Sequence, residues 1–130
     1  MTTPSAEAYA LWADFWQALS HPIRLRVLMT LRQEGALNVG QLVDRLGVGQ
    51  GHLSNHLACL KNCGLVTTEA QGRYVYYRIA DNRVPSLLDL GEAIFQDHWA
   101  GVATCAVVSR PAVKVLIESS SPSGHQGNAE

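Results

Sequence analysis

The sequence predicts a mainly α-helical protein with one small β-hairpin, and three observations support this class. Apolar residues recur at helical spacing through most of residues 5–63. A stretch rich in Thr, Val and Tyr follows, divided by Gln71 and Gly72, a pair that permits the positive φ of a hairpin turn. The chain has 130 residues, 47% of them hydrophobic and 16% charged, which suits one globular core and leaves little room for a second.

Two helices are expected at the start of the chain. Ser5 opens the first as a capping residue. Its broad apolar face consists of large side chains at helical spacing: Leu11, Trp12, Phe15, Trp16 and Leu19. Pro22 suits the first position of the second helix, which ends at Glu34 and Gly35. His21 falls at the N-cap of this helix, where it is a poor choice of residue.

A second pair of helices follows. Asn38 caps a short helix over residues 39–46, and residues 47–49, Gly-Val-Gly, make a tight turn into a helix that runs to Cys63. Gly64 stops that helix. Two helices joined by a glycine turn are typical of a helix-turn-helix. The hairpin directly after them extends the prediction to a winged helix-turn-helix, whose second helix enters the DNA major groove and whose hairpin tip reaches the flanking backbone.

The hairpin is expected to pair residues 65–70 with residues 73–80. A last helix is expected to start near Val84 and to end around Gly101, which places Cys105 beyond it.

The domain prediction assigns residues 1–110 to one DNA-binding and dimerisation domain and residues 111–130 to a C-terminal tail. The end of this tail is rich in Ser and Gly and is expected to be disordered.

Charge and polarity narrow the class of protein. The formal net charge is −1, yet residues 21–80 carry +4, because seven basic residues face three acidic ones there. The longest uncharged stretch, residues 46–60, is too polar to supply the ~20 apolar residues of a membrane span. The N-terminus shows no secretory signal, so we expect a cytoplasmic protein whose three cysteines are free thiols.

The second helix of the predicted helix-turn-helix, which ends at Cys63, has two distinct faces. Leu53, Leu57 and Leu60 fall within about 60° on a helical wheel and form a core face. Short or polar residues lie on the opposite side of this helix. Such a face is either simply exposed to solvent or able to approach the edges of DNA bases, where asparagine can form two hydrogen bonds with adenine. This polar face lies in the basic part of the chain, which favours the interpretation that it binds DNA. The basic side chains would then bind the phosphates. The residues expected to contact DNA are Gln50, Ser54, Asn55, Lys61 and Arg73.

A stripe of ligand-type side chains lies on the flank between these faces. Cys59 and Cys63 are four residues apart, which places their Cβ atoms about 5–6 Å from each other on a helix. They are either small residues packed at the core edge or two ligands of one metal ion. Cys105 is the natural third ligand, with His52 or His56 as alternatives. Three thiolates favour soft ions over zinc, which normally takes four ligands.

Three runs of the sequence resemble the ArsR/SmtB family of metal-sensing repressors. They are residues 18–28 (ALSHPIRLRVL), 54–66 (SNHLACLKNCGLV) and 72–78 (GRYVYYR). The cysteine-containing run resembles the CmtR-like branch of this family, which senses cadmium and lead. This resemblance implies a homodimer through the first and last helices, a metal site made by Cys59 and Cys63 of one subunit with Cys105 of the other, and a repressor that leaves its operator DNA when the metal binds.

Four other functions are weighed against this one. The cysteines could form a thiol redox or persulfide switch on the same fold, or the protein could sense arsenite or zinc. An enzyme using one cysteine with His56 as base is disfavoured because nothing in the sequence orients that histidine. A plain protein-interaction domain is disfavoured by the polar face at Ser54 and Asn55. We therefore predict no enzymatic activity and no membrane association.

Overall fold

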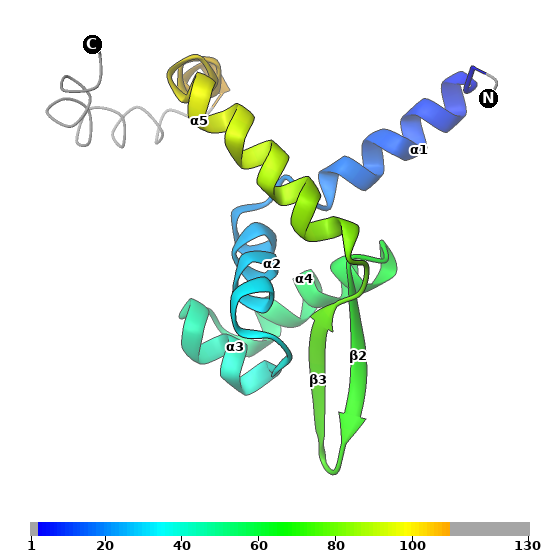
Figure 1. Ribbon diagram of the computed structural model, residues 1–130, viewed down its shortest axis with the longest axis vertical. Coiled ribbons are helices and arrows are strands. Elements are labelled where there is room, and N and C mark those ends of the chain that lie inside the picture. The colour runs from blue at the N-terminus through cyan, green and yellow to red at the C-terminus, as the bar shows by residue number, and fades with distance from the viewer. Residues whose placement is uncertain (1–2, 110–130) are drawn as a thin grey trace, which may run out of the picture. The chain divides into compact units, whose positions relative to one another are not determined.

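The computed structural model describes residues 3–109, with side chains described through residue 105. The elements are α1 (Ala6–Gln17), α2 (Pro22–Glu34), β1 (Leu37–Asn38), α3 (Val39–Leu46), α4 (Gln50–Asn62), β2 (Val66–Gln71), β3 (Tyr74–Ile79) and α5 (Arg83–Ser109). All of them except the two-residue β1 are labelled in Figure 1. The chain divides after Ser86 into two compact units, and each is described by itself below. The order of elements confirms the predicted class of a mainly α-helical protein with a β-hairpin.

The predicted helix starts are confirmed by their capping hydrogen bonds. The Ser5 hydroxyl accepts from the backbone N–H of Ala8 at 3.2 Å. At α3, Asn38 Oδ1 accepts from the Gln41 N–H at 2.8 Å, while Gln41 Oε1 accepts from the Asn38 N–H at 2.9 Å, which completes a capping box. These bonds satisfy backbone donors that the first turn of a helix otherwise leaves without a partner.

The expectation that His21 makes a poor N-cap is wrong. Its Nδ1 accepts a hydrogen bond of 3.1 Å from the backbone N–H of Ile23, and the residue has the extended backbone of a cap. An imidazole nitrogen without a proton is a hydrogen-bond acceptor, so a neutral histidine can replace the usual capping oxygen. The proton of this ring therefore lies on Nε2.

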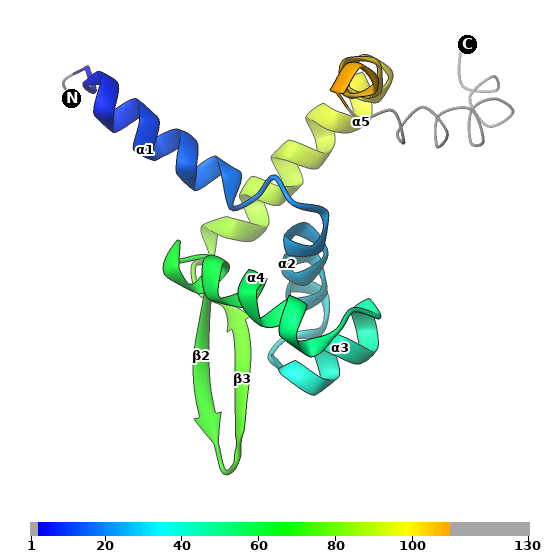
Figure 2. The ribbon, with the colours of Figure 1, turned by 180° about the vertical axis from the view of Figure 1, so that it is seen from behind.

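The core of the first unit is built by α2, α3 and α4. Its fully buried large residues are Val27, Leu28, Leu42, Leu53, Leu57, Leu60 and Val66. The three leucines of α4 form the core face predicted from the helical wheel. Each buried leucine contributes about 1.5–3 kcal/mol relative to exposure in water. This face holds α4 against α2 and α3, as Figure 2 shows from behind.

The sheet has a third strand that the sequence analysis missed. The order is β1-β3-β2, with all pairs antiparallel, and β1 pairs Leu37 with Tyr77 and Asn38 with Tyr76. A strand of two residues has no detectable alternation, and Asn38 also caps α3, so only the helix signal was visible. The pairing ties the start of α3 to the middle of the hairpin.

The hairpin turn lies one residue later than predicted. Gln71 still pairs with Tyr74, so the loop consists of Gly72 and Arg73 rather than Gln71 and Gly72. Gly72 has φ of 64° while Arg73 has no positive φ, which fits a turn whose first loop residue must be glycine. The loop places Arg73 at the tip of a hairpin that extends away from α2, α3 and α4 (Figures 1 and 2).

The last helix is longer than predicted. It runs from Arg83 past Gly101, and Cys105 lies on the helix instead of beyond it. Glycine costs about 1 kcal/mol inside a helix but does not forbid it, and none of the residues from 102 to 109 is a helix breaker. The irregular point is His98, whose φ of −131° and ψ of 20° interrupt the helical backbone. The predicted tail over residues 111–130 lies outside the described residues.

Two helices carry exposed apolar side chains. Helix α1 buries no residue, and Trp12 and Trp16 are 54% and 43% exposed with their ring centroids 6.3 Å apart. On α5 the exposed apolar residues are Leu90, Ile94, Phe95 and Val102. Within the described range, no helix is both long and apolar enough to cross a membrane.

Candidate nucleic-acid interface and cysteine site

The outer face of α4 is uncovered. Gln50, Ser54 and Asn55 are exposed, and no hydrogen bond of their side chains occurs within the described part of the chain. Unpaired amide and hydroxyl groups on an exposed helix are available to base edges, which offer matching donors and acceptors in the major groove. The structure thus places all three predicted base-facing residues on one accessible helix.

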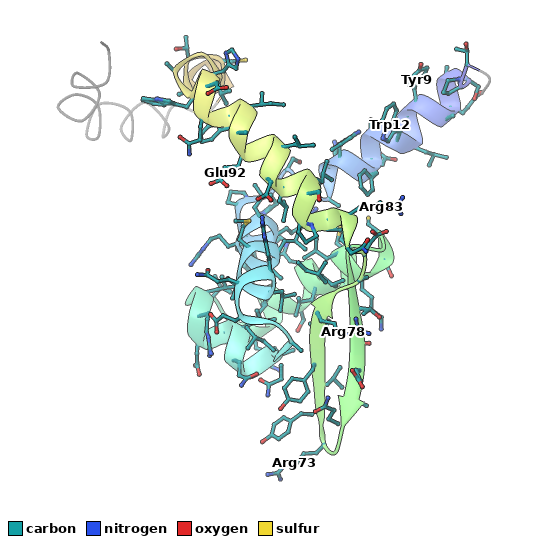
Figure 3. All side chains as sticks on the ribbon, viewed as in Figure 1. Tyr9, Trp12, Arg73, Arg78, Arg83 and Glu92 are labelled. Carbon is teal, nitrogen blue, oxygen red and sulfur yellow. The ribbon has the colours of Figure 1, made fainter. Side chains whose placement is uncertain are left out.

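Exposed cations flank this face. Lys61 lies in the last turn of α4, and Arg73 lies at the hairpin tip with its guanidinium carbon 5.5 Å from the centroid of the Tyr74 ring (Figure 3). Arg78, on β3, is a third exposed cation, and the sequence analysis did not select it as a DNA contact. Within residues 3–105 these three cations have no ion-pair partner, which leaves them available to phosphates.

Other arginines of the first unit are engaged within the fold. Arg45 forms a 2.9 Å ion pair with Glu34, and Arg26 donates to the Leu46 carbonyl at 3.1 Å. The pairing with Glu34 raises the pKa of Arg45, first through the hydrogen bond and then through charge attraction. The cations of this region therefore differ in their partners within the described residues: Arg26 and Arg45 are bound to groups of the fold, whereas Lys61, Arg73 and Arg78 have no ion-pair partner there.

Cys59 and Cys63 lie together on the flank of α4. Both are free and half-buried, and the Cys63 backbone N–H donates to the Cys59 carbonyl at 3.1 Å. Burial, and then the neighbouring Cys59, raise the pKa of the Cys63 thiol, while the charge of Arg24 acts in the opposite direction. Cys63 is thus a protonated thiol at neutral pH, and an ion that binds it must displace the proton.

The predicted third ligand lies in the other unit. Cys105 is exposed on α5. Among the side chains that the structure describes, no three His, Cys, Asp or Glu residues converge on a position that could hold a metal ion. The two predicted ligands that the structure places side by side, Cys59 and Cys63, both belong to the first unit.

A buried histidine adjoins the cysteine pair on α4. His56 is 8% exposed, and its Nδ1 accepts a 3.1 Å hydrogen bond from Arg24 Nε. Its ring centroid lies 4.2 Å from that of His21 and 4.9 Å from that of His52. Burial, followed by the charges of His21, Arg24 and His52, lowers the pKa of His56, so this ring is neutral at pH 7.

Sequence reasoning did not find the contact between Arg24 and His56. Thirty-two residues separate them in the sequence, and neither position carries a signal that indicates the pairing. From the sequence, His56 was considered as a catalytic base, as a metal ligand, or as a surface or core-edge residue, and its burial agrees with a place at the core edge. In the structure its Nδ1 is occupied by Arg24, and its Nε2 is buried without a hydrogen-bond partner in the described chain.

A helix-turn-helix with an uncovered polar second helix, followed by a hairpin with a basic tip, defines the winged helix-turn-helix class of DNA-binding proteins. Residues 21–68 match the family model described as bacterial regulatory protein, arsR family. The chain belongs to this family.

The relatives support the same assignment. The HTH-type transcriptional regulator CmtR of Mycobacterium tuberculosis is 42% identical over 76 residues, 58% of this chain and 64% of the relative, so the match covers less than two thirds of that regulator. The probable mercury resistance operon repressor of Streptomyces lividans is 32% identical over 72% of this chain and 74% of its own length. These relatives are named as regulators, in agreement with the prediction that the protein is not an enzyme.

A solved structure shows the same fold. The homodimeric winged helix-turn-helix DNA-binding domain of Mb0332 from Mycobacterium bovis is 31% identical, with a TM-score of 0.65 over 76% of this chain and 94% of that domain. The predicted winged helix-turn-helix fold is thereby confirmed.

Proposed function

We propose that the protein is a homodimeric transcriptional repressor that releases its operator DNA when a soft metal ion binds to cysteine. The observation that carries this proposal is the position of Cys59 and Cys63 on the flank of α4, the helix whose outer face is uncovered. An ion bound there acts directly on the helix that would read DNA. Family membership and the mercury-related name of one relative support the same class of function. We place the protein in the cytoplasm, where DNA and reduced thiols occur together.

The DNA-binding half of the proposal uses α4 and the hairpin. Ser54 and Asn55 would contact base edges in the major groove, with Gln50 at the start of the helix. Lys61 and Arg73 would hold phosphates, which position the protein without carrying sequence information. In a dimer, the two copies of α4 with their hairpins would bind half-sites about 34 Å apart on the DNA. A small change in the distance between the two copies therefore weakens binding.

The metal half of the proposal uses three thiolates. Cys59 and Cys63 supply two, and Cys105, exposed on α5, would supply the third from the same or the partner subunit. Three sulfur ligands suit a soft ion, so cadmium or lead is the proposed effector, with zinc and arsenite as alternatives. Coupling between two sites is typically about 1–3 kcal/mol, and a nearly complete switch needs about 5.5 kcal/mol, which two ions per dimer would supply.

A redox switch on the same cysteines is the second candidate. The position of Cys59 and Cys63 favours it, because oxidation or persulfidation of either thiol would act on the same flank of α4 as a metal ion. The raised pKa of Cys63 opposes it, because the thiolate is the species that oxidants attack. A metal ion displaces the proton through coordination and does not need a preformed thiolate.

One titration separates these functions. The reduced protein on its operator DNA is titrated with cadmium, lead, zinc and arsenite, while thiolate-to-metal ultraviolet absorption and DNA release are followed together. Release by cadmium or lead with the appearance of the absorption band supports the proposal. Release by peroxide without metal, and none by any of the four ions, would establish the redox switch instead.

Serine variants test the ligand set. Cys59→Ser or Cys63→Ser should abolish both the absorption band and the release, while apo DNA binding stays nearly intact because these residues lie off the outer face of α4. Cys105→Ser should keep weakened metal binding and lose most of the release. A Cys105→Ser protein that binds cadmium and leaves DNA as readily as the parent would exclude Cys105 and point to His52 or His56.

A further inference from the structure

One side chain, Arg24, connects three helices of the first unit. It lies in the first turn of α2, its Nη1 donates to the carbonyl of Gln17 at 3.1 Å, and its Nε donates to His56 Nδ1 at 3.1 Å. Gln17 is the last residue of α1, and His56 lies in the middle of α4. The guanidinium thus spans from the end of α1 to the helix that would read DNA.

The chemistry of both acceptors suits an arginine. The carbonyl of Gln17 belongs to the C-terminal end of α1, where the helix dipole favours a cation. It also accepts from the Ser20 backbone N–H at 3.1 Å and from the Ser20 hydroxyl at 3.0 Å, so Arg24 is the charged donor among three. His56 Nδ1 accepts from Arg24 only when that nitrogen carries no proton, which fixes the ring in one tautomer. The planar guanidinium presents its donors in a rigid fork, whereas a lysine ammonium is a single flexible point.

His56 also lies beside the cysteine pair. It precedes Cys59 by three residues, so the two side chains are neighbours on one flank of α4. Arg24 is near enough to Cys63 for its charge to act on that thiol. Any rotation or shift of α4 that accommodates an ion on the cysteines must therefore move His56 against Arg24.

We propose that Arg24 is a positioning residue that transmits occupancy of the cysteine site from α4 to the end of α1, through its hydrogen bonds to His56 and Gln17. This inference rests on the proposed metal response and identifies the path of its coupling. Helix α1 carries the exposed Trp12 and Trp16, so a displacement of Gln17 alters the placement of the surface through which two subunits would associate. Metal binding on one helix would thus change the spacing of two DNA-reading heads.

Four variants test this path in the full-length protein. R24K keeps the charge but cannot hold both acceptors, and H56L removes the acceptor while filling a similar volume. H56N is the conservative variant, because its amide oxygen can still accept a hydrogen bond near the position of Nδ1. R26K is the matched control, because Arg26 is also on α2 but donates to the Leu46 carbonyl.

The measured quantity is the ratio of operator affinity without and with cadmium. For the parent we expect a ratio of about 5–150. R24K and H56L should lower it at least fivefold, and the double variant should lower it no further than either single change. H56N and R26K should keep the ratio within about twofold of the parent. Cadmium affinity, read from the thiolate absorption, should change by less than about threefold in all four, because the proposed ligand set of Cys59, Cys63 and Cys105 contains none of these residues. A larger loss of cadmium affinity in H56L would make His56 a ligand and overturn its role in the relay.

A second readout does not depend on DNA. In a W12F/W99F background, Trp16 is the single tryptophan and reports on α1. Cadmium should change its fluorescence in this protein, and R24K should abolish the change while still binding cadmium. This measurement keeps the test decisive where a variant binds DNA poorly.

The outcomes separate the relay from the proposed function. A parent that releases DNA with cadmium while R24K shows the same ratio and the same Trp16 response overturns the relay alone. A parent that binds no cadmium, or binds it without DNA release, overturns the proposed function, and the relay is lost with it. If R26K or H56N lowers the ratio of operator affinities without and with cadmium as much as R24K does, the effect is a general structural one. That result also overturns the relay.

Discussion

Helices α1 and α4 both leave a face uncovered within the described chain, but the two faces differ in chemistry. The face of α1 is aromatic, with Trp12 and Trp16 exposed and no buried residue anywhere on the helix. The face of α4 is polar and uncharged at Ser54 and Asn55, while the opposite side is fully buried. The uncovered face of α1 is apolar, whereas the uncovered face of α4 is polar and lies on the side away from the core.

The difference indicates what each helix is built to meet. Removing aromatic surface from water is favourable against any complementary apolar surface, such as a second copy of the same helix. Burying hydroxyl and amide groups is favourable only where a partner restores their hydrogen bonds, as base edges do. We therefore expect α1 to control association of subunits and α4 to control the choice of DNA sequence.

The largest effect should come from the inner side of α4. Leu57→Ala removes a fully buried side chain and should lower the free energy of unfolding by about 2–5 kcal/mol. Asn55→Ala, on the outer face of the same helix, should change it by less than about 0.5 kcal/mol. Urea denaturation of both variants checks the contrast, and equal losses would show that the two faces are wrongly assigned.

The next effect concerns association through α1. Replacing Trp12 and Trp16 together with alanine should weaken the dimer by at least about 2 kcal/mol, or roughly 30-fold, because exposed aromatic residues dominate interfaces. Sedimentation equilibrium measures this change. Asp14→Asn, exposed on the same helix, is the control and should leave the dimer unaffected. A parent protein that sediments as a monomer at micromolar concentration, with and without DNA, would remove the basis of this prediction.

Substitutions in the DNA-binding surface should change DNA affinity by a free energy similar to or smaller than the loss in dimer stability. Asn55 and Arg73 should affect different properties of DNA binding. Asn55→Ala should cost about 1–3 kcal/mol in discrimination between operator and random DNA. Arg73→Ala should weaken binding to all sequences alike and reduce the slope of log K against log salt by about 1. Fluorescence anisotropy at several salt concentrations separates the two effects. If both variants lose specific and non-specific affinity equally, Asn55 does not read bases.

The smallest effect should be a pH dependence that originates in His56. Its pKa is lowered in the folded protein, so the unfolded chain binds more protons in the window below the usual value of 6.5. The stability contributed by the neutral ring is fully present above pH 6.5 and is lost as the pH falls through the folded pKa. Denaturation at pH 7 and pH 5 should show a smaller loss for H56L than for the parent.

Much of the fold follows from local signals in the sequence. Asn38 marks the start of α3 as its cap, the leucines of α4 define its buried face, and Gly72 marks the hairpin loop to within one residue. Such features depend on neighbours a few residues away. The polar face at Ser54 and Asn55 was predicted for the same reason, since a helical wheel needs only the helix itself.

The features that escaped prediction depend on distant contacts. The cap at His21, the pairing of β1 with β3 and the hydrogen bond from Arg24 to His56 each require a partner or tautomer that spacing does not encode. The end of α5 was misjudged because Gly101 was read as a stop, although one glycine without a capping contact need not end a helix. The role of Cys105 stays a prediction, because it depends on a second subunit or on the arrangement of two units.

The short strand β1 also has a consequence for the order in which the protein folds. Its pairing joins residues 37 and 77, and the loop closed between them contains all of α3 and α4. The helix pair uses local contacts and can form early, whereas this closure must overcome the entropy of a long loop and belongs among the slower steps. The hairpin would then acquire its fixed relation to the start of α3 only when β1 docks, so the complete arrangement of α3, α4 and hairpin should appear later in refolding than the first helical signal.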